Sequence, residues 1–366
     1  MKLRSAFAFL ALVPLALAQQ TGKPDDHAKF LGGLSVAGTA LENLSEDTGW
    51  KRHAKESDAA WSEFDARQLS KIREWSQQEL PEAAAEKGPL FYMFSGPDML
   101  HAQTFFPNAS VTLLSGLEPV GAIPDVTTVP RASLGGALSN LRNSINTVLA
   151  FSFFRTKDMK VDLQATQLNG TLPVIYIFLA RTGCSIESVD LVSLNDAGEL
   201  VTEKGATQGA KIIFTRKGGL KQTAYYFTTD LSNEGIRKHK GFITFCGSFG
   251  KGAGFTKAAS YLMHNSYFSD VRDFLLASSS TLVQDDSGIP VKHFNPDQWY
   301  LRYFGNYPGP IEMFKDRYQP DMAAAYKSAT TAPLPFSFGY RWHTRESSLI
   351  AAINLKAIPK ALPVTE

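Results

Sequence analysis

Leu90-Phe-Tyr-Met-Phe94 is a continuous apolar run that ends at the turn Ser95-Gly-Pro-Asp98. A short helical stretch from Asp98 to Phe106 and a second apolar run, Val111-Thr-Leu-Leu114, complete a strand–helix–strand unit. Fully apolar strands are typical of the middle of a parallel sheet that is covered on both faces. This stretch therefore predicts an α/β fold.

A second unit of the same kind lies toward the other end of the chain. It consists of a strand from Phe255 to Met263, for which a helix is the alternative, a helix from Phe268 to Ala277 and a strand at Thr281-Leu-Val283. The alternation of strands and helices predicts a three-layer α/β core around a mixed, partly parallel sheet.

The segment between the two units supplies further helices and hairpin insertions. We predict a helix from Ser133 to Phe151, a strand at Val174 to Leu179, hairpins that turn at Asn195-Asp-Ala-Gly198 and Lys217-Gly-Gly219, and a helix capped by Ser232-Asn233 that runs to Phe245. Short aromatic strands are expected near Trp299-Tyr300 and Phe336-Ser-Phe338.

The first eighteen residues have the pattern of a secretory signal peptide. Lys2 and Arg4 form a positive region, Ala6 to Leu15 an apolar region, and Ala16-Leu17-Ala18 a small-x-small cleavage site. The apolar run is shorter than the roughly 20 residues that a bilayer requires. We therefore expect a soluble protein that is secreted or periplasmic, with no transmembrane segment in the mature chain.

Residues 19–87 are predicted to form a helical N-terminal region that packs on an α/β core domain at 88–366. Ser57-Asp58 can cap a helix that ends at Leu80-Pro81, and Gly88-Pro89 marks the change of pattern. The apolar residues of this helix fall close to one face, which is typical of packing on a larger body: Trp61, Phe64, Leu69, Ile72 and Trp75.

Charge and cysteine content exclude several classes of protein. Without Lys2 and Arg4, the chain carries 35 basic and 35 acidic side chains, so no overall field favours nucleic acid, and we predict no nucleic-acid partner. Cys184 and Cys246 either pair with each other or serve as two buried apolar residues. The sequence has no C-x-x-C, which leaves redox exchange and structural zinc without support.

The sequence predicts no cofactor and no metal. Glu118 lies 22 positions after Gly96, as does the ribose-binding acid of dinucleotide folds, but the turn at Gly96 has one glycine where the fingerprint G-x-G-x-x-G has three. The glycine-rich stretch from Gly247 to Gly254 lacks the Ser or Thr that a phosphate loop carries after Gly250-Lys251, and is interpreted as a helix-to-strand connection. The seven histidines show no metal-binding spacing.

Polar residues at the ends of the predicted strands define the candidate site. In open α/β sheets the ligand crevice lies beyond the carboxyl ends of the strands. The residues expected to share such a cleft are Ser95, Asp98, Glu118, His264, Asp285 and Asp286. Each has a structural alternative, since Asp98 is well placed to cap a helix and Asp285-Asp-Ser-Gly288 is a favourable turn.

These observations favour an exported α/β protein that binds an unknown small molecule or a partner protein. The alternative is a hydrolase or transferase whose acid/base groups are Asp98, Glu118, Asp285 and Asp286. A nucleophile at Ser95 with His101 as its base is a further arrangement that the sequence leaves open. An interaction protein that uses residues 19–87 is the third class.

Overall fold

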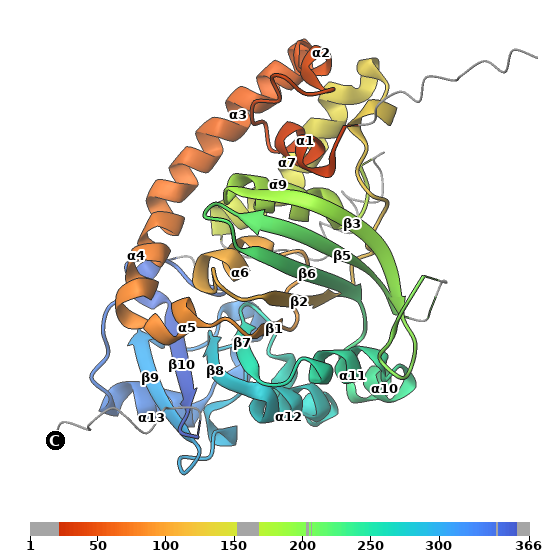
Figure 1. Ribbon diagram of the computed structural model, residues 1–366. Helices are drawn as coiled ribbons and strands as arrows, with labels where there is room; N and C mark the ends of the chain where they lie inside the picture. The colour runs from red at the N-terminus through yellow and green to blue at the C-terminus, as the bar shows by residue number, and fades with distance from the viewer. Residues whose placement is uncertain (1–21, 152–167, 203–204, 206, 342, 357–366) are drawn as a thin grey trace, which may run out of the picture.

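The computed structural model describes residues 22–151, 168–202, 205, 207–341 and 343–356 of the 366-residue chain (Figure 1). The predicted signal peptide at 1–18 lies outside the described residues.

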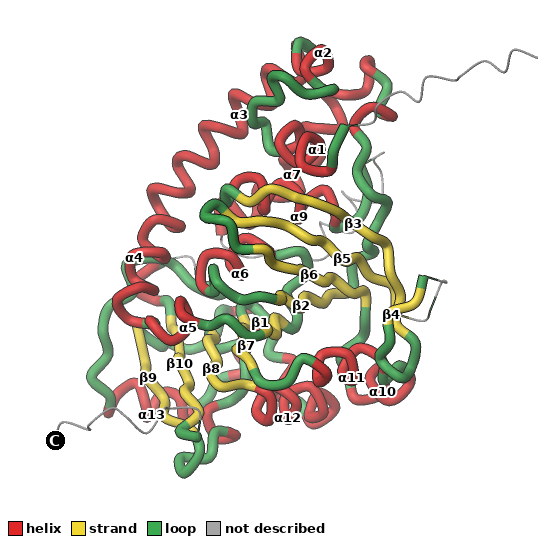
Figure 2. The backbone as a smooth tube through the Cα atoms, in the orientation of Figure 1, coloured by secondary structure: helices red, strands yellow, loops and turns green. Residues whose placement is uncertain are grey.

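One ten-stranded mixed sheet forms the centre of the described structure (Figure 2). The strand order is β4-β3-β5-β6-β2-β1-β7-β8-β10-β9. Five neighbours, β6, β2, β1, β7 and β8, run parallel, and antiparallel pairs extend the sheet at both ends. The strands are β1 Pro89–Tyr92, β2 Val111–Gly116, β3 Cys184–Leu194, β4 Leu200–Val201, β5 Thr207–Arg216, β6 Lys221–Thr228, β7 Gly252–Thr256, β8 Ser279–Gln284, β9 Trp299–Gly305 and β10 Ser348–Asn354.

Helices cover both faces of this sheet (Figure 1). On one face lie α1 Pro24–Leu31, α2 Glu42–Ser45, α3 Thr48–Phe64, α4 Ser70–Glu79, α5 Pro81–Ala85, α6 Met99–Phe105, α7 Arg131–Phe151 and α9 Leu172–Arg181; on the other lie α10 Asn233–Lys238, α11 Gly241–Ser248, α12 Ser269–Ser278 and α13 Pro320–Ser328. Short 3-10 turns occupy Val126–Thr128, Leu262–His264, Ser266–Phe268, Val291–His293, Glu312–Arg317 and Thr344–Glu346.

Strand β1 shows why a hydrophobic cluster lies on each face of the sheet. Its residues are all buried, and successive side chains point to opposite faces of the sheet. Leu90 and Tyr92 belong to the hydrophobic cluster under α6 and α9, whereas Phe91 and Met93 belong to the cluster under α11 and α12. The predicted three-layer α/β core with a mixed, partly parallel sheet and hairpin insertions is confirmed.

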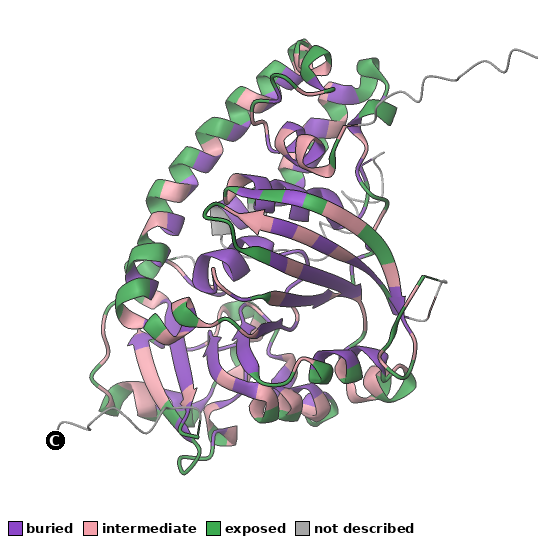
Figure 3. Ribbon diagram, viewed as in Figure 1, coloured by how far each residue is buried: buried purple, intermediate pink, exposed green. Residues whose placement is uncertain are grey.

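Helices α3 and α4 are joined by a π-helical turn at Asp65–Leu69 into one long N-terminal helix. This turn keeps the apolar residues of the long helix on one face. The stripe is spaced by three residues from Trp61 to Phe64, but by five from Phe64 to Leu69. A π-turn takes up the additional residue, so that Ile72 and Trp75 return to the buried face. Buried residues of this helix join the same hydrophobic cluster as β1 and β2 (Figure 3).

Five local predictions are wrong. Val174 to Leu179 is not a strand but part of α9, a helix that begins at Leu172, has Pro173 in its first turn and is buried from Leu172 to Ala180. A fully apolar run has no periodicity that separates a buried helix from a buried strand. The helix expected to begin at Ser57-Asp58 begins at Thr48, because the Asp47 carboxylate caps it by accepting from the N–H groups of Gly49 and Trp50.

The remaining corrections concern the second half of the chain. The strand expected from Phe255 to Met263 is instead β7, Gly252–Thr256, which ends at Thr256 because Ala258, Ser260 and Tyr261 take positive φ angles. The helix expected from Ser232 to Phe245 is two helices, α10 and α11, broken at His239-Lys240. Phe336 to Phe338 forms a single isolated bridge, from Phe338 to Arg341, rather than a strand.

Cys184 and Cys246 are both free and buried, which decides between the two alternatives for these residues. Within the described residues, no helix is both long enough and apolar enough to cross a bilayer.

Candidate ligand-binding site

The order in which the chain adds strands to the sheet reverses at β1. The chain passes from β1 through α6 to β2 on one side, and later returns to place β7 on the other side of β1. Helix α6 lies on one face of the sheet, and α12, which joins β7 to β8, lies on the other. Loops that leave two neighbouring parallel strands toward opposite faces separate from each other, and this opens a crevice at the carboxyl ends of the strands.

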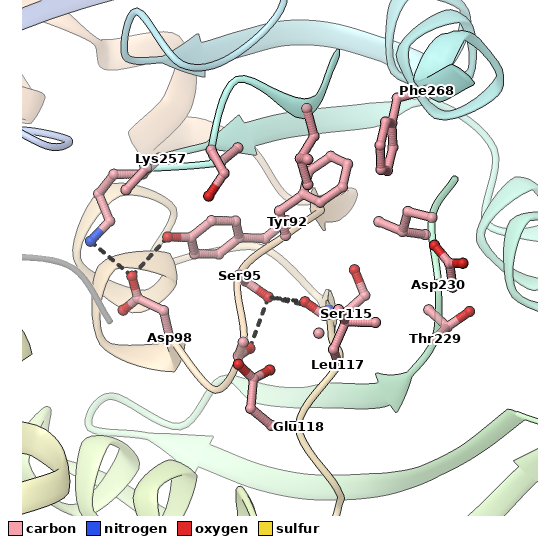
Figure 4. A pocket seen from close by; sticks show the side chains of 18 residues that line it. Tyr92, Ser95, Asp98, Ser115, Leu117, Glu118, Thr229, Asp230, Lys257 and Phe268 are labelled. Carbon is pink, nitrogen blue, oxygen red and sulfur yellow. Dashed lines mark hydrogen bonds and ion pairs between the residues drawn. The ribbon is translucent and has the colours of Figure 1, made fainter. Parts of the chain in front are cut away.

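A cavity of about 250 Å³ occupies this position (Figure 4). Its lining comes from the segments that follow four of the parallel strands. Ser95 and Gly96 follow β1, Glu118 follows β2, Asp230 follows β6 and Lys257 follows β7. Tyr92, Asp98 and Lys257 lie together at one end of the cavity, and Asp230 and Phe268 lie at the other (Figure 4).

The structure brings three of the six predicted site residues to this cavity. Ser95, Asp98 and Glu118 line it. His264, Asp285 and Asp286 follow β7 and β8 at the same edge of the sheet, but they are not among the lining residues.

Asp98 is at the centre of a buried polar cluster. It caps α6 by accepting from the His101 N–H at 3.1 Å, and it accepts from the Tyr92 hydroxyl at 2.7 Å. The Lys257 ammonium lies 3.0 Å from Asp98 Oδ2, and His101 Nδ1 lies 2.9 Å from Asp98 Oδ1. All four residues are buried. A carboxylate with this many donors has little capacity left to accept another proton.

The charges within this cluster favour an ion pair between Asp98 and Lys257. Burial alone would raise the pKa of Asp98, but His101, Lys257 and Tyr92 together hold that pKa well below its usual range. Burial lowers the pKa of Lys257, which Asp98 opposes, and burial likewise lowers the pKa of His101. The cluster therefore combines an ionised Asp98 with a neutral His101 near pH 7.

Glu118 differs from Asp98 because its carboxylate keeps open acceptor capacity. Only 3% of the residue is exposed, and its backbone is held by the hydroxyls of Tyr226 and Thr228, which donate to the Glu118 carbonyl at 2.8 and 2.7 Å. The Tyr226 hydroxyl also lies beside the carboxylate, but a phenol has one proton, and here it goes to the carbonyl. The lone pairs of Glu118 are therefore available to a molecule in the cavity.

Ser95 is held by backbone groups rather than by a base. Its hydroxyl lies 2.9 Å from the Gly96 carbonyl and 3.3 Å from the Ser115 carbonyl, and it accepts from the Ser115 N–H at 3.2 Å. His101 Nδ1 faces Asp98 and Lys257 instead. The geometry gives Ser95 a role in joining β1 to β2 and provides no nucleophile–base pair between Ser95 and His101.

Asp285 and Asp286 are sealed beside the cavity. Asp285 accepts from the N–H groups of Ala258 and Ser287 and from the Ser287 hydroxyl, and Asp286 accepts from the Tyr261 hydroxyl. Burial raises the pKa of Asp286 to about 7, and the neighbouring Asp285 adds to this shift. Burial also raises the pKa of Asp285, against the hydrogen bonds from Ser287.

His264 lies against the Tyr261 ring, with 5.1 Å between the ring centroids. Burial lowers the pKa of His264 to about 4, and the charge of Arg317 adds to this shift. The imidazole is therefore neutral near pH 7.

Backbone strain is concentrated at the cavity. In the described residues, the non-glycine residues with positive φ are Phe94, Ala258, Ser260 and Tyr261. The first three line the cavity and the fourth follows directly. Such conformations cost on the order of 1–3 kcal/mol each and are found mainly where function requires them.

Sequence reasoning missed Lys257, Tyr92 and Asp230. Lys257 falls inside the strand predicted from Phe255 to Met263, and Tyr92 belongs to the apolar run from Leu90 to Phe94. A lysine at the carboxyl end of an otherwise apolar strand is the signal that could have indicated the first of these.

Comparison with family models, curated proteins and solved structures finds no match to this chain. Among the described residues, no group of three or more His, Cys, Asp or Glu side chains is arranged to hold a metal ion.

Proposed function

We propose that this protein is exported and binds a small molecule in the cavity at the carboxyl ends of β1, β2, β6 and β7. The observation that carries the proposal is the buried Glu118 carboxylate, whose open acceptor capacity faces a cavity at the switch point of the sheet. A buried polar group without a full set of partners is costly unless a ligand or water completes it.

The composition of the lining supports the same proposal. Leu117, Leu231 and Phe268 form an apolar part, while Glu118, Asp98 and Lys257 supply a few polar groups. Small-molecule sites combine a mostly apolar wall with a small number of placed polar groups. The strained residues beside the cavity support it as well, because such backbone conformations cluster at functional sites.

The hydrolase or transferase alternative remains a prediction, but fewer candidate acid/base groups lie at the cavity than the sequence suggested. Two of its four carboxylates, Asp98 and Glu118, line the cavity. Asp98 is saturated by donors, so Glu118 is the carboxylate that could serve as a general base. An interaction role for residues 19–87 gains no support from the long helix, because its apolar stripe is buried in the core.

A compound library and a cavity-blocking variant test the proposal. At 100 times its dissociation constant, a ligand stabilises the folded protein by about 2.7 kcal/mol, which is measurable as a rise in melting temperature. Leu117 is 56% exposed at the cavity, and Leu117→Trp is expected to fill the cavity and abolish that rise.

The matched control is Leu191→Trp on β3, where the leucine is 49% exposed and lies outside the cavity lining. It is expected to keep the full rise. The proposal is wrong if no compound stabilises the protein, or if Leu117→Trp responds to the ligand as well as Leu191→Trp does.

A further inference from the structure

The order of the parallel strands indicates the chemical class of the ligand. With the β3–β5 insertion set aside, the strands β6, β2, β1, β7 and β8 are the third, second, first, fourth and fifth in the chain. In doubly wound sheets with this order, an acidic residue about 20 positions beyond the first glycine accepts hydrogen bonds from a ribose. Glu118 directly follows β2, at the cavity, and lies 22 positions after Gly96.

Gly116 makes room for this carboxylate. A Cβ at Gly116 would collide with Glu118 Oε2, so only glycine allows the side chain to fold back there. A Cβ at Gly96, which has a φ of +53°, would lie 3.6 Å from the same oxygen. The absence of a side chain at Gly116 is therefore what allows this carboxylate conformation, whereas the contact at Gly96 is an ordinary one.

Phosphate groups are excluded from the position where dinucleotides place them. That position is the N-terminus of the helix after the first strand, where free N–H groups face the anion. Here the carboxylate of Asp98 accepts from the His101 N–H and so occupies the N-terminus of α6. The N–H group that a pyrophosphate would use there is already taken by Asp98, and the carboxylates of Glu118 and Asp230 at the cavity would repel a phosphate.

The size of the cavity also argues against a dinucleotide. Its volume of about 250 Å³ is slightly below the roughly 300–1,000 Å³ of drug-sized sites. It accommodates a single nucleoside rather than two linked nucleotides.

The opposite end of the cavity is suited to a base that carries an amino group. Leu117 and Leu231 offer apolar contact for a planar ring. The Asp230 carboxylate is held by the N–H and hydroxyl of Ser232, at 2.8 and 2.9 Å, and each of its oxygens retains a second lone pair.

We infer that the ligand is a nucleoside without phosphate groups, whose ribose hydroxyls bind Glu118 and whose amino-bearing base lies between Leu117, Leu231 and Asp230. This inference rests on the proposed function of the cavity as a small-molecule site.

Calorimetric titration of the full chain with adenosine, 2′-deoxyadenosine, inosine and AMP tests it. Adenosine is expected to bind, and loss of the 2′-hydroxyl should weaken binding roughly tenfold or more, because it removes a hydrogen bond to a charged group. Glu118→Gln should have a similar effect, because it removes the charge of the acceptor. AMP and inosine are each expected to bind roughly tenfold more weakly than adenosine, through repulsion by the acidic lining and through loss of the amino group.

A cycle that combines ligand and protein changes shows whether the hydroxyl and the carboxylate contact each other. In Glu118→Gln, removing the 2′-hydroxyl should cost much less than it does in the unmodified protein. Glu312→Gln, on an exposed glutamate outside the cavity lining, is the matched control and should leave adenosine affinity unchanged. The deoxyadenosine measurement on the unmodified protein needs no variant, so a folding defect in Glu118→Gln cannot mask the result.

The outcomes separate this inference from the proposed function. If no nucleoside binds but another compound binds in a way that Leu117→Trp abolishes, the inference is wrong and the small-molecule site stands. Binding of AMP as tightly as adenosine, or costs of the two changes that simply add, would also overturn the inference. If nothing in the library binds, both fail.

Discussion

Two pairs of carboxylates follow apolar parallel strands at the same edge of the sheet, yet they meet different surroundings. Asp98 and Glu118, after β1 and β2, line a cavity, whereas Asp285 and Asp286, after β8, are sealed by packed chain. The first pair lies at the switch point, where successive connections cross to opposite faces and separate. Beyond β7 no such separation occurs, and the segment around Tyr340 and Gln319 closes over the β8 end. A shared sheet edge is therefore not sufficient to define a site.

A second difference appears within the cavity itself. Asp98 is paired with a buried ammonium and three further donors, and Glu118 keeps its lone pairs open. The two carboxylates are equally buried, so burial does not distinguish a structural carboxylate from one that binds a ligand. Their hydrogen-bond partners do. Variants of the carboxylates at this edge of the sheet test these differences.

Asp98→Ala is expected to have the largest effect. It leaves the Lys257 ammonium buried without its counter-ion, and removing one partner of a buried pair costs about 3–5 kcal/mol. Urea unfolding should show this loss in the free energy of unfolding. Glu46→Ala is the control, because Glu46 is 69% exposed and its partner Lys51 is 55% exposed, so the variant should cost less than about 1 kcal/mol. Equal losses in the two variants would mean that the cluster is not a structural ion pair.

Asp286→Asn should change how stability depends on pH. The folded-state pKa of Asp286 is raised to about 7 by burial and by Asp285, while the unfolded value is near 3.8. Between these values the unfolded chain releases a proton that the folded protein retains, so the unmodified protein loses stability as pH rises from about 4 to about 7. The slope reaches at most about 1.4 kcal/mol per pH unit.

The asparagine variant lacks this titration but keeps an acceptor for the Tyr261 hydroxyl. Its unfolding free energy, measured from pH 4 to pH 8, should therefore converge with or exceed that of the unmodified protein as pH rises. Parallel curves over this range would contradict the raised pKa.

Asp285→Ala should have a smaller effect, and on stability alone. The variant removes the acceptor for the N–H groups of Ala258 and Ser287, and an unpaired buried donor costs about 1–3 kcal/mol. Ligand affinity in the cavity should stay within about twofold of the unmodified value when measured by titration below the melting temperature. A loss of affinity or activity without a loss of stability would instead restore Asp285 as a site residue.

Much of this architecture follows from local patterns. The runs at Leu90 to Phe94 and at Val111 to Leu114 are too apolar for an exposed surface, and the turns at Asn195 to Gly198 and Lys217 to Gly219 have the chemistry of hairpins. Val174 to Leu179 could not be predicted in the same way. Its surroundings in the packed core, which no local pattern records, decide that it is a helix.

The candidate site, like the fold, was predictable from local sequence only in part. Polar residues after apolar strands were sufficient to predict that Ser95, Asp98 and Glu118 lie at one edge of the sheet. The same rule also selected His264, Asp285 and Asp286, which occupy that edge but not the cavity. Strand order separates the two groups, and strand order depends on contacts between residues far apart in the chain.

By itself, the sequence determined that this chain forms an α/β core with parallel central strands and that acidic side chains follow those strands. It could do so because hydrophobic periodicity and turn chemistry act over a few residues. Only the tertiary structure decided that Lys257 neutralises Asp98, that His101 and Tyr92 saturate it with hydrogen bonds, and that Glu118 is left open beside a cavity. Those outcomes depend on which distant groups share a buried volume, because charge and hydrogen bonding act through space rather than along the chain.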